Sequence, residues 1–543
     1  MPEYLSPGVY MEEVEVGSKP IEGVSTSTAG FLGATERGPL KPRLITNFTD
    51  YQRVYGGYIN DSFLTYSVDA FFTNGGKRVY VGRVVSTTNK VAQTHKIKDS
   101  NGKPSFILRA TGPGSWANRI SIKIDKASLS DKNSEWFKLT LHYYSTEEAK
   151  NESMKDNSKV RPDSDEIFDN ISTNPKSSTY FKKVINGTSN LVTVWASKGY
   201  TPGALPNTTS KEFMGTSSEP SPVSKDKKDK EEPPKAADSG IIDLSSFKGW
   251  EETIKDPFDD SVVEVIQTGL LGFTKIDEIS IVCAPDEVNV EGLQGAVTTH
   301  CENMKDRFAV LQSKRDNNVP AKFDQIANTL DSKYAAIYMP WVNMIDPPTG
   351  LKKLVPPGGH IAGIYARSDI ERGVHKAPAN ETVRGINGLQ IVIDKEQQGT
   401  LNPKGVNVLR SFPGRGVLVW GARTTSSDPN WKYINVRRLF IYIEKSIERA
   451  TQWLVFEPNN EKLWARVVAT INQFLNGVWR TGALMGTTQN EAFFVKCDRS
   501  TMTQDDIDNG RLVCLIGIAP TKPAEFVIFR IAQTKSGTEI EEL

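Results

Sequence analysis

Histidine and cysteine side chains are the first candidates for chemistry, because they bind metals and act as nucleophiles, acids or bases. The 543-residue sequence contains five histidines and four cysteines. His300 stands next to Cys301, but adjacent residues of a helix point about 100° apart and do not hold a metal ion without further ligands. The cysteines are scattered without a C-x-x-C pair: Cys283, Cys301, Cys497 and Cys514. We therefore expect neither a metal site nor a disulfide framework.

A second candidate is the one cluster that combines histidines with carboxylates. His360 and His375 flank Asp369 and Glu371. No serine or cysteine nucleophile stands nearby, so hydrogen bonding in a loop or interface is favoured over catalysis. The sequence contains no G-x-x-x-x-G-K-[ST] phosphate loop, no G-x-S-x-G nucleophile elbow and no H-E-x-x-H metal motif. These observations predict a protein without a cofactor that is not an enzyme.

The composition excludes further classes of protein. Lys and Arg number 66 against 65 Asp and Glu, which gives a net charge of +1 and argues against non-specific nucleic-acid binding. No stretch approaches the ~20 apolar residues of a membrane helix, and the first residues do not resemble a secretion signal. We expect a soluble protein of two to four domains that is made in the cytoplasm.

Alternating strand and helix signals predict the central architecture. A helix is expected at 63–72 and a strand at 78–84, within a first core segment at 26–85. In the middle domain, 246–370, strands at 278–284, 307–312 and 334–342 alternate with helices at 288–306 and 323–330. This alternation is typical of a βαβ layer with a largely parallel sheet. The predicted fold class is α/β and α+β, in several domains.

Two other regions differ from this α/β pattern. Residues 86–245 contain short strand candidates between polar stretches and are predicted to form an inserted β-rich outer domain, with a flexible surface loop at 201–240 that has too few apolar residues to fold. In 371–524, apolar residues at helical spacing predict helices at 440–454 and 464–478, the second with an Asn cap. Strands are expected at 512–518 and 525–532, the latter followed by a polar tail.

Several sequence blocks, in a fixed order, resemble the contractile tail sheath family. Near the N-terminus they are the opening S-P-G-V-Y at 6–10 and F-F-T-N-G-G at 71–76. The C-terminal part adds P-P-G-G-H-I-A-G at 356–363, R-G-V-H-K-A-P-A-N at 372–380, W-G-A-R-T at 420–424, V-F-E-P-N at 455–459 and I-G-I-A-P at 516–520. The resemblance covers about 1–85 and 270–533, and does not extend to 130–245.

The resemblance implies a mechanical role. Subunits of this family polymerise as stacked hexameric rings around an inner tube and contract from a metastable extended state, which drives the tube through a target membrane. Implied partners are other copies of the chain, the inner tube protein, and baseplate and terminal cap proteins, with no nucleic acid and no direct membrane insertion. The particle would assemble in the cytoplasm and belong to a phage tail or to a released or anchored injection machine.

The resemblance also implies which residues make contacts. An N-terminal arm, 1–25, and a C-terminal arm, 525–543, would add strands to neighbouring subunits, and 371–524 would form an inner domain. The candidate arm residues are Ser6, Pro7, Gly8, Val9, Tyr10, Phe526, Val527, Ile528, Phe529 and Ile531. Contact with the tube should be polar, because a sheath must release its tube. The candidates on the hydrophilic helix faces are Lys445, Arg449, Lys462 and Arg466.

Two alternatives remain open at this point. The first is an α/β enzyme with a site in the middle domain, which would need a cluster of titratable groups in a pocket. The second is a surface adhesin that binds through the inserted domain. The sequence does not distinguish a phage tail from a bacteriocin or an extracellular injection system, nor does it identify the target cell or reveal whether sister sheath proteins co-assemble.

Overall fold

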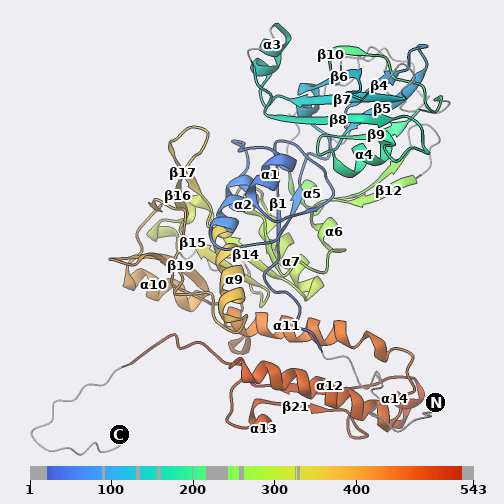
Figure 1. Cartoon of the computed structure of the whole chain (residues 1–543). Coiled ribbons are helices and arrows are strands. Elements are labelled where there is room, and N and C mark those ends of the chain that lie inside the picture. Colours follow the sequence, from blue (N-terminus) through green and yellow to red (C-terminus); the bar gives the residue numbers. More distant parts are fainter. Residues whose placement is uncertain are drawn as a thin grey trace, which may run out of the picture. The chain divides into compact units, whose positions relative to one another are not determined.

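The computed structural model describes residues 21–88, 92–129, 135–155, 160–197, 200–215, 242–255, 262–323, 326 and 330–528 (Figure 1). The chain divides into two compact units. The core unit contains Gly23–Val374 and Pro378–Lys445. The terminal unit contains Met1–Glu22, His375–Ala377 and Ser446–Leu543.

An eight-stranded sheet forms the centre of the core unit, with the strand order β2-β3-β1-β13-β14-β15-β19-β20. The six inner strands are parallel, and β2 and β20 run antiparallel at the two edges. The sequence predicted a largely parallel sheet, and this is confirmed. The strands are β1 (Ala29–Gly33), β2 (Arg43–Ile45), β3 (Val79–Arg83), β13 (Ile281–Cys283), β14 (Phe308–Gln312), β15 (Ala335–Met339), β19 (Val406–Phe412) and β20 (Gly416–Val419).

Both faces of this sheet are covered, because successive side chains of each strand enter two different apolar clusters. Phe31 packs in one cluster and Leu32 in the other. The first cluster includes α2 (Leu64–Thr73) and α9 (Gly358–Arg372), and the second includes α6 (Gly269–Phe273) and α7 (Leu293–Met304). Figure 1 shows α2 and α9 on one side of the sheet and α6 and α7 on the other. Strands covered on both faces read as continuous apolar runs, which is why the sequence revealed them.

Helices α2 and α9 pack with almost no side chain between them. A Cβ atom at Gly359 would lie 2.4 Å from the Ser67 carbonyl oxygen, and one at Gly363 would lie 2.6 Å from the Phe71 carbonyl oxygen. Helix α2 ends where Gly75 adopts φ +102°, which a residue with a side chain rarely tolerates. The F-F-T-N-G-G and P-P-G-G-H-I-A-G blocks are therefore the two halves of one helix–helix contact.

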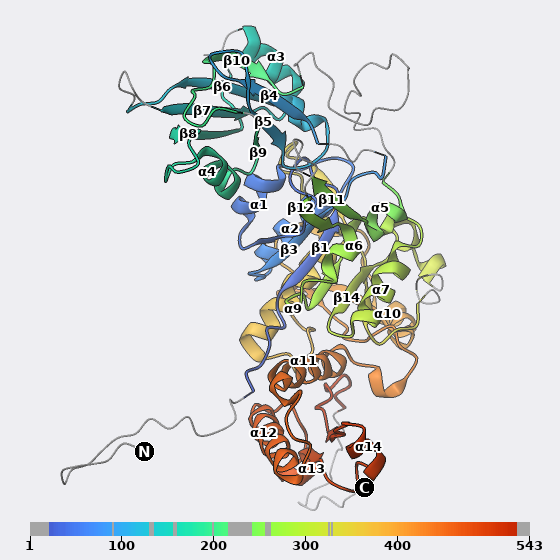
Figure 2. The same cartoon turned by 90° about the vertical axis from the view of Figure 1, so that its right-hand side faces the viewer.

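Residues 92–215, within the segment predicted to be an inserted domain, form a β-rich region with its own apolar core. A three-stranded sheet, β4-β5-β9, packs with a four-stranded sheet, β10-β6-β7-β8 (Figure 2). The region attaches to the first core segment by contacts such as Arg37 over the Tyr143 ring, at 4.4 Å. Its elements are β4 (Thr94–Lys98), β5 (Pro104–Ala110), β6 (Ile120–Lys126), β7 (Trp136–Tyr143), α3 (Glu147–Lys155), β8 (Ser164–Ser172), α4 (Phe181–Thr188), β9 (Val192–Ala196) and β10 (Thr209–Phe213).

Two predicted boundaries are corrected. The flexible loop at 201–240 was extended too far, because β10 pairs with β6 and buries Phe213 and Met214; residues 216–241 lie outside the described residues. The predicted boundary between the middle and inner domains at 370 is also wrong, since β19 and β20 continue the central sheet. The two compact units divide at Lys445 instead.

The remaining elements of the core unit complete its surface. A three-stranded sheet, β17-β16-β18, and a two-stranded sheet, β11-β12, lie outside the central sheet. The elements are α1 (Phe48–Tyr55), α5 (Leu244–Lys248), β11 (Glu251–Lys255), β12 (Val262–Gln267), β16 (Val342–Ile345), β17 (Lys352–Val355), β18 (Gly388–Leu389) and α10 (Lys395–Leu401).

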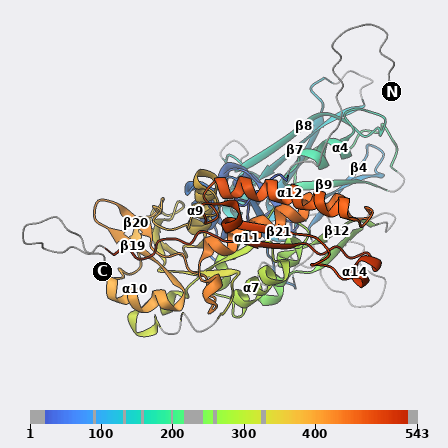
Figure 3. The ribbon, with the colours of Figure 1, turned by 90° about the horizontal axis from the view of Figure 1, so that it is seen from below.

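The terminal unit is built on α12 (Glu461–Arg480), which follows the last turns of α11 (Ile434–Ala450). The predicted cap is confirmed: the Asn460 side chain accepts a hydrogen bond from the Leu463 backbone N–H, at 3.0 Å. The other elements are α13 (Gln489–Ala492), β21 (Phe493–Lys496), α14 (Gln504–Asp508) and β22 (Leu515–Ile518), and β21 and β22 form an antiparallel two-stranded sheet (Figure 3).

Candidate assembly surfaces

Three of the histidine and cysteine candidates, His300, Cys301 and His360, are buried inside the core unit. His360 is fully buried in α9, and burial lowers its pKa to about 4, so the ring is neutral at physiological pH. Asp369 faces the Arg438 guanidinium and not a histidine. Burial likewise lowers the pKa of His300 to about 4, assisted by the positive charge of Arg307, and Cys301 is completely buried. Within the described part of the chain, no group of three or more His, Cys, Asp or Glu residues is arranged to hold a metal ion.

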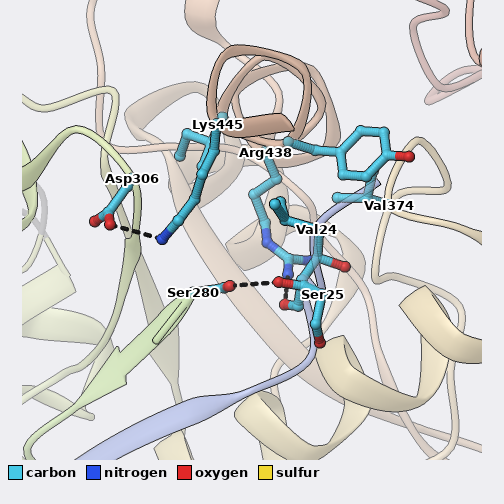
Figure 4. A pocket seen from close by; sticks show the side chains of 10 residues that line it. Val24, Ser25, Ser280, Asp306, Val374, Arg438 and Lys445 are labelled. Atoms are coloured by element: carbon cyan, nitrogen blue, oxygen red, sulfur yellow. Dashed lines mark hydrogen bonds and ion pairs between the residues drawn. The ribbon is translucent and has the colours of Figure 1, made fainter. Parts of the chain in front are cut away.

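The segment that leads away from the predicted N-terminal arm is held firmly in the core unit. The Ser280 hydroxyl donates to the Ser25 carbonyl oxygen at 2.9 Å, and Arg438 donates to the Thr26 carbonyl oxygen at 3.0 Å (Figure 4). Arg438 also forms a bidentate pair with Asp369, at 2.6 and 2.8 Å. The cavity beside these groups measures about 10 Å³, room for no more than a water molecule. These contacts hold residues 24–26 in the core unit, and the cavity leaves no room for a ligand larger than water.

The arm residues themselves are only partly described. Ser6, Pro7, Gly8, Val9 and Tyr10 lie outside the described residues, as do Phe529 and Ile531. Phe526, Val527 and Ile528 are 71%, 67% and 80% exposed, and within the described part of the chain they belong to no strand. Their apolar side chains are therefore available to another molecule.

One of the four cations predicted to contact the tube is reassigned. The Lys445 ammonium binds the Asp306 carboxylate at 2.7 Å, and its side chain is only 13% exposed (Figure 4). The helical pattern placed Lys445 on the hydrophilic face of its helix correctly, but it could not reveal that Asp306, from the turn after α7, covers that position. Lys445 is a structural ion-pair partner and not a surface contact.

The other three cations are exposed on the terminal unit. Arg449 stands in the last turn of α11, and Lys462 and Arg466 stand one helical turn apart on α12. The Arg466 guanidinium lies 4.1 Å from the centre of the Trp453 ring, which fixes its direction by a cation–π contact. These residues remain available for a polar interface.

Sequence reasoning missed an exposed apolar tip on the loop between α11 and α12. Phe456 is fully exposed, at 101%, and adopts φ +70°, and the neighbouring Val455 is 61% exposed. A positive φ is rare for an aromatic residue, and the two adjacent exposed apolar side chains make this loop a candidate contact surface. The position of Phe456 directly before Glu457-Pro458, between two amphipathic helices, was the signal that could have revealed it.

The sheet β21-β22 is a second open surface of the terminal unit. No third strand pairs with it among the residues that the structure describes. Phe494 and Leu515 are 52% and 54% exposed on its outer face. A sheet of two strands is marginally stable alone and leaves backbone N–H and C=O groups unpaired at both edges.

No helix among the described residues is both long enough and apolar enough to cross a bilayer.

Comparisons with known proteins agree with this architecture. Residues 270–425 match the family model for the phage tail sheath protein central domain, and residues 426–534 match that for the phage tail sheath C-terminal domain. The tail sheath protein of Enterobacteria phage T4 is 26% identical over 268 residues, which are 48% of this chain and 38% of that protein. A Pseudomonas aeruginosa putative prophage major tail sheath protein is 23% identical over 246 residues, which are 44% of this chain and 62% of that protein. The chain thus spans little more than a third of the first curated relatives it matches.

Solved structures match over nearly the whole chain. The contracted PVC sheath complex of an extracellular contractile injection system has a TM-score of 0.56 at 21% identity, covering 98% of this chain and 99% of that one. The contracted helical sheath of the anti-feeding prophage has a TM-score of 0.55 at 23% identity, covering 98% and 100%. These likenesses establish the fold, and the two adjoining domain matches establish descent. Through residues 270–534, this chain belongs to the contractile tail sheath protein family.

Proposed function

We propose that this chain is a sheath subunit that polymerises as stacked hexameric rings around an inner tube. In this proposal the rings contract from a metastable extended state and drive the tube through a target membrane. The observation that carries it is the open β21-β22 sheet of the terminal unit, together with the exposed apolar segment at 526–528, which has no strand partner among the described residues.

The chain ends act as arms in this proposal. The N-terminal segment Ser6 to Tyr10 and the C-terminal segment Phe526 to Ile531 add strands to the β21-β22 sheets of neighbouring subunits. Main-chain hydrogen bonds give such strand addition its affinity, and alternate side chains give it register. A two-stranded sheet that gains strands leaves the marginal range and becomes stable. The exposed Val455 and Phe456 contact neighbouring copies of this chain, because apolar contacts suit a permanent assembly.

The proposed contact with the tube is polar, unlike the apolar contacts between sheath subunits. Arg449, Lys462 and Arg466 are exposed cations that form salt-screened pairs of ~0.2–1 kcal/mol each with a tube subunit. Such contacts set the register of the tube without locking it. Contraction itself is driven by burial: ~500 Å² of additional apolar contact per subunit supplies ~12 kcal/mol before losses to ordering and desolvation. No nucleotide is required.

The proposed sheath function implies two further partners, a baseplate and a terminal cap. The sheath would dock on a baseplate at one end and a terminal cap at the other; one of the structural relatives is an anti-feeding prophage baseplate. Assembly in the cytoplasm, within a phage tail or a released or anchored injection particle, also belongs to this proposal. No specific observation favours the enzyme or the adhesin alternative.

The test uses one residue of the C-terminal arm. Val527→Pro removes a backbone N–H and blocks strand pairing, whereas Val527→Ala keeps the backbone intact. Because Val527 is 67% exposed, neither change should alter folding of the subunit. We expect the Pro variant to remain a folded monomer while the Ala variant forms tubes, as seen by negative-stain electron microscopy. Tubes formed equally well by the Pro variant would refute the arm mechanism.

A further inference from the structure

Two cysteines stand opposite each other at the base of the β21-β22 sheet. The last residue pair of the sheet is Lys496 with Leu515, so the next pair outward is Cys497 with Cys514. Directly opposed residues of an antiparallel pair have Cα atoms about 4.5–5.5 Å apart. A disulfide bond requires roughly 4.4–6.8 Å, so the backbone already has the required spacing.

The side chains also converge. Cys497 is 6% exposed and packs in an apolar cluster with Leu463, Trp464 and Met502, against which Cys514 packs as well. The two thiol groups lie within hydrogen-bonding reach of each other. Both follow the alternation of their strands, so they point to the inner face of the sheet, together with the buried Phe493. Neither movement of a strand nor a change of face is needed to join them.

We propose that Cys497 and Cys514 are a redox-sensitive dithiol that closes to a disulfide in oxidising surroundings. With a small disulfide as the oxidant, the partly exposed Cys514 thiolate attacks one sulfur, forms a mixed disulfide and releases one small thiolate. Cys497 then attacks the Cys514 sulfur, forms the internal bond and releases the second small thiolate. The protein dithiol loses two protons and two electrons, and one small disulfide becomes two small thiols.

The surroundings of Cys514 determine how fast the disulfide bond forms. Burial, followed by the neighbouring Cys497, raises the pKa of Cys514 to about 12, so little thiolate is present at neutral pH and exchange is slow. The pair therefore stays reduced during synthesis in a reducing cytosol and closes during long exposure outside it. The bond ties the two ends of the 497–514 segment, which includes α14, and so holds the hairpin closed.

The reaction can be followed in the full-length, unmodified protein. After treatment with oxidised glutathione or the azo oxidant diamide, trypsin should release the peptide 497–499 linked to the peptide 512–530. Cys283 and Cys301 are completely buried in the core unit and serve as internal controls that stay reduced in the folded protein. Cys514→Ser should abolish the linked peptide. Linkage of Cys497 or Cys514 only to cysteines of other molecules, or no linkage at all, would overturn the proposal.

A second measurement checks the effect of the bond. A loop of this length should lower the frequency of local opening roughly 100-fold in the chain-entropy description. Amide hydrogen exchange in β21 and β22 should therefore slow on oxidation, while exchange in β14 should not change. Unchanged exchange in β21 and β22 would show that the bond does not hold the hairpin closed. The bond can be detected in free subunits, so its presence or absence is independent of whether the subunits form a sheath.

Discussion

The central sheet and the β21-β22 sheet contrast within one chain. Every residue of β14 and β15 is buried, and apolar clusters cover both faces of their sheet. No residue of β22 is buried, and β21 has only Phe493 buried. The apolar side chains of the central sheet are covered by other parts of the same subunit. The β21-β22 sheet, by contrast, still has exposed apolar side chains and open strand edges. Under the proposed function, the core unit therefore accounts for folding and the terminal unit for assembly.

The ion pairs repeat the same contrast. Arg438 and Asp369 in the core unit are 3% and 2% exposed, and Arg499 and Glu461 in the terminal unit are both 72% exposed. A buried pair is costly to break, because the remaining charge has no solvent, while an exposed pair contributes little. Changes in the core unit should therefore reduce stability, and changes on the terminal unit should reduce assembly.

The largest expected effect comes from breaking the buried pair. Asp369→Ala leaves the Arg438 charge uncompensated and should lower the free energy of unfolding by about 3–5 kcal/mol. The matched change Glu461→Ala, in the exposed pair, should cost less than about 1 kcal/mol. Urea denaturation measures both. Equal losses in the two variants would contradict the contrast between the units.

Two buried carboxyl groups of the core unit predict a dependence of stability on pH. Burial raises the pKa of Glu287 to about 8 and that of Asp286 to about 6. A carboxyl group with a raised pKa binds its proton more tightly in the folded state. Its contribution is therefore most favourable below the unfolded pKa near 4.5 and declines as pH rises toward 8, by up to about 1.4 kcal/mol per pH unit.

The Glu287→Gln variant tests this slope. It should flatten the dependence of unfolding free energy on pH between about 5 and 8, measured by urea denaturation at several pH values. Glu278→Gln is the matched control, because the Glu278 side chain is 46% exposed, and it should leave the slope as in the wild type. If both variants kept the wild-type slope, the Glu287 carboxyl would not be the group responsible.

Truncation of the exposed Phe456 side chain should impair assembly of the sheath but leave the stability of the subunit unchanged. Because the Phe456 side chain is 101% exposed among the described residues, Phe456→Ala should change the unfolding free energy by less than about 0.5 kcal/mol. As an interface anchor it should contribute about 2 kcal/mol, which raises the concentration needed for tube formation roughly 30-fold. Sedimentation assays measure this concentration. Unimpaired assembly would exclude Phe456 from the subunit interface.

The smallest effect is expected at the proposed tube contact. Lys462→Glu combined with Arg466→Glu should weaken co-assembly with tube at physiological salt by about 1–2 kcal/mol, while contracted sheath still forms. Lys103→Glu combined with Lys176→Glu, on exposed positions of the β-rich region, makes the same change in net charge and should have no effect. Co-assembly as tight as wild type would remove this helix face from the tube contact.

Much of the core was predictable, because its strands are continuous apolar runs and its helices have regular apolar spacing. The order of the strands was not, since β13 lies beside β1 although about 250 residues separate them. The ion pair between Arg438 and Asp369 could not be predicted either, because the local sequence pattern does not indicate contacts between residues 69 positions apart. Phe456 escaped notice for the opposite reason: an exposed aromatic residue looks like any other until its backbone and surroundings are known.

The glycine contact between α2 and α9 has a mechanical consequence. Where backbone meets backbone at Gly359 and Gly363, there are no long side chains to rearrange under load, so the joint is stiff. In the proposed sheath, a subunit stiffened in this way would transmit force without absorbing it. Elastic compliance in a stack of such subunits would then reside in the joints between them, as in a chain of rigid links.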